Sequence, residues 1–278
     1  MFLTVSESGS FAVQTFAEGI EENSNDVTTD DVGIPPDSYD YAYPDMMKAT
    51  NITIGLDFFK DINQSAETTQ NEITEIIDNL ESYGLNTIII NTSYNGVVYY
   101  EIGAKIYKSG SPLDMLIDVA RQHNFFVYIS FDLSDAIASK GIEELREKID
   151  YLSLCAHKLT NKYRIDGIVL EGYYASKGSD SYSDYLLNGS GIGFENWLRD
   201  NSGYVFRLVS NAIRSTSNTV SVGIAIENAW MNKRNDERGS DTKDDFEALA
   251  DGFSDTKAYI ENGYADFMIV TCFGGLKS

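Results

Sequence analysis

The stretch RIDGIVLEGYY, residues 164–174, joins an apolar run to a single acid. Residues 168–170 are Ile-Val-Leu, and Glu171 follows at once, ahead of a glycine and two tyrosines. A strand buried on both faces does not need a carboxylate, because a charge in the core is costly. A strand whose C-terminal end opens into an active site often carries one. The neighbouring segments decide between these two interpretations.

Five other segments of the chain are typical of β-strands. They are NITIGLDFF from residue 51, NTIIINT from 86, FFVYISFD from 125, TVSVGIAIE from 219 and ADFMIVTCF from 265. All six strands are apolar along their whole length, a pattern that indicates burial on both faces, as in a parallel sheet covered by helices. Stretches with the apolar spacing of a helix lie between them.

The helical stretches are recognised by this spacing and by their ends. The first stops at Gly84, a natural C-cap, and places on one face Ile73, Ile76, Ile77, Leu80 and Tyr83. The second begins with Ser111 as N-cap and Pro112 at the first helical position. Further helices are predicted over residues 141–162 and 194–215, and one more ends at about residue 262.

This alternation predicts an α/β fold. Six βα-type repeats without a dinucleotide-binding glycine motif favour a (β/α)8 TIM-type barrel, with a doubly wound sheet as the alternative. Strands seven and eight are absent, so residues 51–278 are expected to form an incomplete barrel of about six βα units. The sixth strand, residues 266–273, should then lie at an open edge, unless a missing barrel segment or a partner chain covers it.

The first fifty residues differ from the rest. Residues 18–45 are acidic, have no apolar period and contain three of the four prolines. Residues 1–50 are therefore predicted to be a disordered acidic linker. The first 17 residues lack the basic start and the unbroken apolar core of a signal peptide, although they could be the remnant of an export segment. An extracellular or cell-envelope location is the expectation.

Composition limits the partners. A formal charge of −22 over 278 residues disfavours nucleic acid and anionic membranes. No apolar run approaches the ~20 residues of a membrane span. No metal or cofactor motif is present, so neither is expected. Cys155 and Cys272 are predicted to be small buried side chains, and His123 and His157 to be surface or hydrogen-bonded residues. Residues 235–251 are predicted to be a solvated acidic face, with a fortuitous cation site as the alternative.

Polar side chains collect where the predicted strands end. In a barrel of this kind the active site forms at the C-terminal ends of the strands. A sugar site requires carboxylates for proton transfer, amides for the hydroxyls and aromatic rings for stacking. The candidate catalytic residues are Asp57, Asp132, Glu171 and Glu227. The candidate substrate-binding residues are Asn91, Tyr94, Asn95, Tyr173, Tyr174, Asn228 and Trp230.

Two of these acids also have a simpler interpretation. Asp57 could cap a helix or close a turn, and Asp132 could form an Asx turn at the start of LSDAIASKG. Glu171 is the strongest candidate, because glutamate is a poor turn former and a costly core residue.

Five motifs occur in one order along residues 51–278. They are YGLNTIIINTSYNGVVYY, SPLDMLIDVARQHNFFVYISFD, RIDGIVLEGYY, WLRDNSGYVFRLV and FSDTKAYIENGYADFM. Together they resemble the glycosyl-hydrolase-like family 10 barrels of bacteria, including the Trp-x-Arg-Asp-Asn pattern of that family at Trp197, Arg199, Asp200 and Asn201. The resemblance implies a barrel fold and a glycosidase activity. It also implies that the barrel is often part of a secreted or cell-envelope protein.

The departures from the family fall at the strand ends. The family usually has two consecutive aspartates after the fourth strand, where this chain has Glu171 and Gly172. The fifth strand ends in AIENAW, which keeps Trp230 and adds Glu227. The Pro-Gln-x-Tyr element of the sixth strand is replaced by IVTCFGG. The resemblance therefore implies the fold more fully than the catalysis.

Two classes of function remain open. The first is a glycoside hydrolase acting on a polysaccharide, with Glu171 as general acid/base and Glu227, Asp57 or Asp132 as its partner. The second is a non-catalytic carbohydrate-binding or scaffold barrel derived from a glycosidase. A barrel enzyme acting on a small metabolite is a more distant third, because no phosphate or cofactor motif is present.

Overall fold

The structure is a computed structural model of the chain. It describes residues 47–94, 97–98, 110–139, 142–163, 165–178, 181, 184–186, 189, 191–226, 228–243 and 245–270. Most of the segment expected to be a disordered linker, residues 1–46, lies outside the described residues. The first strand begins at Ala49, so the boundary expected at residue 50 falls inside it.

Six parallel strands form one sheet, and their order in the sheet is their order in the chain. A doubly wound sheet reverses its strand order at a switch point, so this sequential order excludes it. The predicted incomplete α/β barrel is confirmed. The strands are β1 (Ala49–Thr53), β2 (Thr87–Asn91), β5 (Phe126–Asp132), β6 (Gly167–Glu171), β7 (Ser221–Ile226) and β8 (Phe267–Val270).

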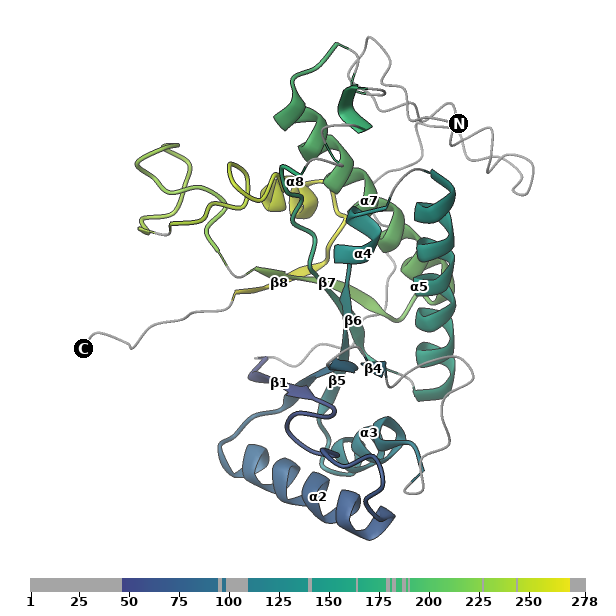
Figure 1. The fold of residues 1–278 in the computed structure, drawn as a ribbon. Helices are drawn as coiled ribbons and strands as arrows, with labels where there is room; N and C mark the ends of the chain where they lie inside the picture. Colours follow the sequence, from purple (N-terminus) through teal and green to yellow (C-terminus); the bar gives the residue numbers. More distant parts are fainter. Residues whose placement is uncertain are drawn as a thin grey trace.

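Four long helices cover one side of this sheet (Figure 1). They are α2 (Ala66–Ser82), α3 (Pro112–Gln122), α5 (Ile142–Tyr163) and α7 (Phe194–Thr216). Ser111 caps α3 as predicted, since its hydroxyl accepts a hydrogen bond from the Asp114 amide. The placement of Tyr83 on one helical face with Ile73 and Ile77 is wrong. That helix ends at Ser82, and the Tyr83 side chain is 79% exposed.

The sheet has a separate core on each face. On the helical side, alternate strand residues such as Ile88, Ile129 and Ile168 pack against the helices. On the inner face, Ile89, Tyr128 and Val169 form a second cluster together with Phe126, Ala225, Phe267 and Ile269. These two sets alternate along each strand, because successive side chains point to opposite faces. The fully apolar strands of the sequence are thus explained by burial on both sides.

The helix predicted to end near residue 262 is much shorter than expected. Among the described residues between β7 and β8, only α8 (Thr256–Glu261) is an α-helix, and a long irregular segment from β7 leads to it. The carboxylate of Glu247 holds that segment together, because it accepts hydrogen bonds from the amide and side chain of Asn232 and from Asn235. Glu247 is 5% exposed, so the interpretation of residues 235–251 as a solvated face is wrong at that position.

Strand β8 lies at one end of the strand order of the sheet, as predicted for the sixth strand. On its outer face Met268 is 50% exposed, whereas the equivalent position of β7, Ile224, is fully buried. A partner chain or further barrel segment over β8 remains a prediction. Among the described residues, no helix is long and apolar enough to cross a membrane.

Candidate active site

Four polar side chains continue the inner face of the sheet at the C-terminal ends of its strands. Asn91 follows Ile89 by two residues, Ser130 and Asp132 follow Tyr128, and Glu171 follows Val169. Because strand side chains alternate, these residues point to the same face as the inner apolar cluster. The strand register pairs Asn91 with Ser130, and Asp132 with Glu171. The sequence therefore places a polar edge directly above an apolar floor.

Hydrogen bonds from two serines orient the two carboxylates at this edge. The Ser130 hydroxyl donates to Oε1 of Glu171. The Ser134 amide donates to Oδ1 of Asp132 over 2.8 Å, and the Ser134 hydroxyl donates to the same oxygen. The Asx turn predicted as the alternative for Asp132 is thus present, and it starts the short helix α4 (Ser134–Ile137). The turn leaves Asp132 exposed beside Glu171.

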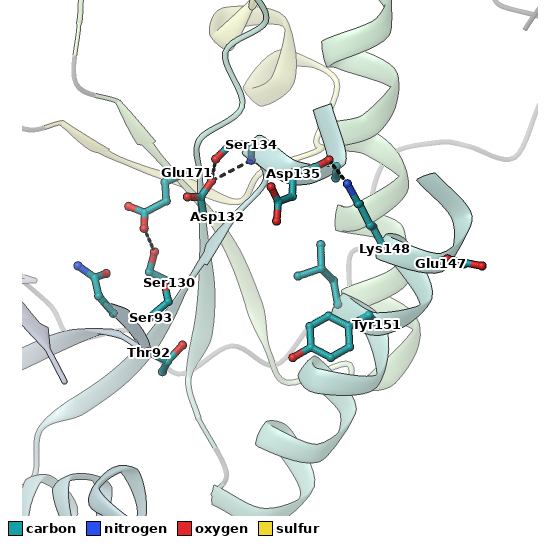
Figure 2. Close-up of a pocket in the computed structure, with 13 residues that line it drawn as sticks. Thr92, Ser93, Ser130, Asp132, Ser134, Asp135, Glu147, Lys148, Tyr151 and Glu171 are labelled. Atoms are coloured by element: carbon teal, nitrogen blue, oxygen red, sulfur yellow. Dashed lines mark hydrogen bonds between the residues drawn. The ribbon is translucent and has the colours of Figure 1, made fainter. Parts of the chain in front are cut away.

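A cavity of about 390 Å³ opens next to these acids (Figure 2). One wall comes from the ends of β2, β5 and β6, and the other comes from α4 and the first turns of α5. The volume is in the range of small-molecule sites. The lining residues are Asn91, Thr92, Ser93, Ser130, Asp132, Ser134, Asp135, Ala136, Glu147, Lys148, Tyr151, Leu152 and Glu171.

Only some of the candidate acids line this cavity. Glu171 and Asp132 line the cavity, together with the candidate amide Asn91. Asp57 does not, because its carboxylate accepts a 2.7 Å hydrogen bond from the Thr53 amide and closes the turn after β1. This is the simpler of the two interpretations open for Asp57. Glu227 lies outside the described residues.

The candidate tyrosines belong mainly to the protein interior. Tyr173 is 1% exposed, and its hydroxyl donates to the Ala225 carbonyl over 2.6 Å. Its ring has no face available to a sugar, which corrects the expectation of a substrate contact. Tyr174 packs against the Tyr173 ring at 4.7 Å. Tyr94, in the two-residue strand β3 (Ser93–Tyr94) that pairs with β4 (Val97–Val98), packs against the main core.

The remaining candidates lie beyond the cavity lining. Asn95 is outside the described residues, and half-buried Asn228 is in the segment after β7. The Trp230 indole donates to Asp255, the N-cap of α8, over 2.8 Å. The cations of Arg238 and Lys257 lie 5.2 and 5.5 Å from its ring. Trp230 is therefore held by its own neighbours and not by the strand ends.

The Trp-x-Arg-Asp-Asn motif of α7 is structural. Trp197 is 4% exposed and packs in a small apolar cluster with Phe253. The Arg199 guanidinium donates to the Leu249 carbonyl over 3.0 Å, which ties the segment before α8 to α7. Burial raises the pKa of the Asp200 carboxyl. None of these residues lines the cavity.

Within the described part of the chain, one set of side chains brings three possible metal ligands within 4.8 Å of one another. It consists of Asp78, Glu81 and His123, at the ends of α2 and α3 in the helical layer. His123 already pairs with Glu81 over 2.7 Å, as predicted for a hydrogen-bonded surface residue. His157 contacts Asn161, and Cys155 is buried as predicted, while Cys272 is outside the described residues.

Sequence reasoning missed several residues of the cavity. Ser130 could have been found, since it is the polar inward position two residues before Asp132 in an apolar strand. Thr92 follows the last residue of β2, but alternation places it on the opposite side from Asn91, so the same signal does not mark it. Lys148 and Tyr151 come from α5, and their position depends on how that helix packs against the sheet. No local pattern marks them.

Relatives of the chain are named as glycosyl hydrolases. The chain is 26% identical over 152 residues to the glycosyl hydrolase DigH of Escherichia coli K12, a match that covers 53% of the chain and 33% of that protein. It is 26% identical over 131 residues to the glycosyl hydrolase YngK of Bacillus subtilis, with 46% and 24% covered. The chain thus spans about a third or less of the length of these relatives. No family model matches it.

Solved structures with a partial likeness include other glycosidases. A family 1 β-glucosidase from Thermotoga maritima aligns with 72% of the chain and 53% of its own, at 12% identity and a TM-score of 0.42. A β-galactosidase from Marinomonas ef1 aligns with 65% and 37%, at 8% identity and a TM-score of 0.44. Such distant likenesses carry no information about chemistry. The named relatives support a glycosidase-like protein, and family 10 in particular is not confirmed.

Proposed function

We propose that this chain carries the catalytic site of a glycoside hydrolase that cleaves a polysaccharide, with Glu171 as general acid/base. One observation carries the proposal. Glu171 and Asp132 end neighbouring strands in register, point to the inner face and border the same cavity. A pair of carboxyl groups on either side of the scissile bond is the usual equipment for this reaction. The named relatives and the motifs of the family 10 barrels agree with it.

Asp132 is the partner carboxylate that fits best. Of the other two candidates, Asp57 closes a turn after β1 and does not line the cavity, and Glu227 is outside the described residues. In the proposed reaction Glu171 donates its proton to the glycosidic oxygen as the bond to the anomeric carbon breaks. The Asp132 carboxylate stabilises the positive charge that develops at that carbon. Water supplies the new hydroxyl group, and its proton restores Glu171.

Two neighbours support these roles. The Ser130 hydroxyl donates to one oxygen of Glu171 and so fixes the orientation of the carboxylate at the edge of the cavity. The Asn91 side chain donates to the Thr53 hydroxyl over 3.2 Å, while its carbonyl oxygen has no hydrogen-bond partner among the described residues. A sugar hydroxyl at the cavity would provide the donor that this oxygen lacks.

The test is Glu171→Gln in the full chain. Bacterial and plant cell-wall polysaccharides are screened for new reducing ends, and the active one is then used to compare variants. We expect the rate to fall by about 10²–10⁴-fold, while glycan binding and the melting temperature stay near those of the parent, because the amide keeps the size of the acid. Glu75→Gln, an exposed change on α2, serves as control and should leave the rate unchanged.

An unchanged rate in Glu171→Gln would remove Glu171 from the role of acid. If the parent chain binds a polysaccharide but hydrolyses none, the non-catalytic carbohydrate-binding barrel is the correct description.

A further inference from the structure

The cavity beside Glu171 is strongly acidic. Three carboxylates face it, two at the strand ends and Asp135 from α4, while the carboxylate of Glu147 points away (Figure 2). The only cation among the described lining residues is Lys148. Its ammonium group is already bound by the Asp135 carbonyl at 2.7 Å and by Glu144 at 2.8 Å. The wall therefore presents negative charge that its own lysine does not neutralise.

A buried hydroxyl on the cavity wall lacks a partner. Thr92 is 2% exposed, and its Oγ1 makes no hydrogen bond among the described residues. Figure 2 shows this side chain on the wall, below Ser130 and across from Tyr151. A buried polar atom without a partner is costly, so a ligand that supplies the missing hydrogen bond gains affinity. Together with the free carbonyl oxygen of Asn91, Thr92 makes the wall rich in acceptors.

These features distinguish between classes of ligand. An acidic sugar would place a carboxylate against three others, which is unfavourable. A small metal ion needs several oxygens close together, and within the described ranges only Asp78, Glu81 and His123 bring three ligand atoms within 4.8 Å. Neither of these two arguments applies to an organic cation whose charge is carried by a larger group. A protonated amine has three donors for acceptors such as Asn91 and Thr92 and a charge for the carboxylates.

We infer that the cavity binds a sugar unit with a free, protonated amino group, so that the preferred polysaccharide contains hexosamine without its N-acetyl group. The inference rests on the proposed function for its substrate, but its evidence is the charge and the acceptors of the cavity wall. N-acetylation removes the positive charge and two of the amine hydrogens. The amide form should therefore bind less well, even though its hydroxyl groups are the same.

The test compares two tetrasaccharides by calorimetry with the full chain at a pH that keeps the amine protonated. One is a β-1,4 glucosamine tetramer, and the other is its fully N-acetylated form. We expect the amine form to bind at least about tenfold more tightly, which corresponds to about 1.4 kcal/mol. Equal affinity, tighter binding of the N-acetylated form, or no binding of either would overturn the inference.

A chain with a net charge of −22 attracts any cation, so a control for unspecific attraction is needed. Asp135→Asn removes a carboxylate that faces the cavity, and Asp150→Asn removes an exposed one from α5 outside it. We expect Asp135→Asn to reduce the preference for the amine at least threefold and Asp150→Asn to leave it unchanged. Equal effects of the two variants would show a general charge effect and refute the site.

The readout is binding, so it separates this inference from the proposed function. If the amine preference is found but no glycan is hydrolysed, only the hydrolase proposal fails. If hydrolysis is found with no amine preference in binding, only the inference fails.

Discussion

At Gly172 the backbone has a φ of +66°, and an added Cβ would lie 1.9 Å from Oδ1 of Asp132. The residue has no side chain because the Asp132 carboxylate occupies the space where one would be. Gly172 therefore does more than permit the turn after β6. It leaves the space in which the Asp132 carboxylate lies, and the proposed chemistry depends on the position of that carboxylate.

The first prediction concerns this glycine. Gly172→Ala should destabilise the fold by roughly 1–2 kcal/mol through its left-handed backbone alone, and it should also displace Asp132 and reduce hydrolysis. Gly84→Ala is the matched control, because Gly84 has a φ of +72° and nothing within 4 Å of an added Cβ. It should cost similar stability without lowering the rate. Urea unfolding and the reducing-end assay measure both, and equal rates in the two variants would contradict the role of Gly172.

At the scale of elements, two aspartates make the same set of contacts at the N-terminal ends of the strands, at the opposite edge of the sheet from the cavity. Asp166 precedes β6, accepts from the Val127 amide of β5 and pairs with an arginine of α3. Asp266 precedes β8, accepts from the Val222 amide of β7 over 2.7 Å and pairs with Arg214 of α7 over 2.8 Å. Each aspartate thus joins two strands and a helix where the strands begin. These contacts keep the strands in register, and with them the site at the C-terminal ends of the strands.

The second prediction tests these contacts by a change at Arg214. Its side chain and that of Asp266 are 9% and 10% exposed, so Arg214→Ala leaves a buried carboxylate without its partner. We expect the free energy of unfolding to fall by about 3 kcal/mol or more. Lys177→Ala removes one partner of an ion pair in which both side chains are about half exposed, and it should cost less than about 1 kcal/mol. If urea unfolding shows similar losses of unfolding free energy in the two variants, the buried pair stabilises the fold no more than the exposed pair does.

At the scale of the whole molecule, three buried groups make the free energy of unfolding depend on pH in the alkaline range. Burial raises the pKa of the Cys155 thiol to about 11 and that of Tyr259 to about 12, and it also raises the pKa of Tyr204. A raised pKa in the folded chain means that folding favours the protonated group. The stabilisation is complete below the pKa of the unfolded chain, about 8.5 for cysteine and about 10 for tyrosine, and it is lost as the pH rises through the folded values.

The third prediction follows from that sign. The free energy of unfolding should be constant near pH 8 and fall by at least the order of 1 kcal/mol between about pH 9 and pH 11. Urea unfolding at several pH values measures it. Cys155→Ala should flatten the first part of the fall. A stability that rises over this range, or that is insensitive to Cys155→Ala, would contradict the account.

Much of the molecule follows from local properties of the sequence. Strands that are apolar along their length, helices with caps such as Ser111, and the absence of a dinucleotide motif were sufficient to predict an incomplete parallel barrel. The ends of the strands placed Asn91, Asp132 and Glu171 correctly at one edge, because every parallel strand ends on the same side of the sheet. Each of these inferences needs only the spacing of residues along one element.

Contacts between distant elements were decided by the tertiary structure alone. The bond from Ser130 to Glu171 depends on the register of two strands, the burial of Tyr173 depends on where α7 and α8 pack, and Tyr151 reaches the cavity through the rotation of α5. Asp57 lies at a strand end like the others, yet a turn uses its carboxylate. Periodicity along the chain determines which side of an element a residue occupies. What that side meets is determined by packing between elements far apart in sequence.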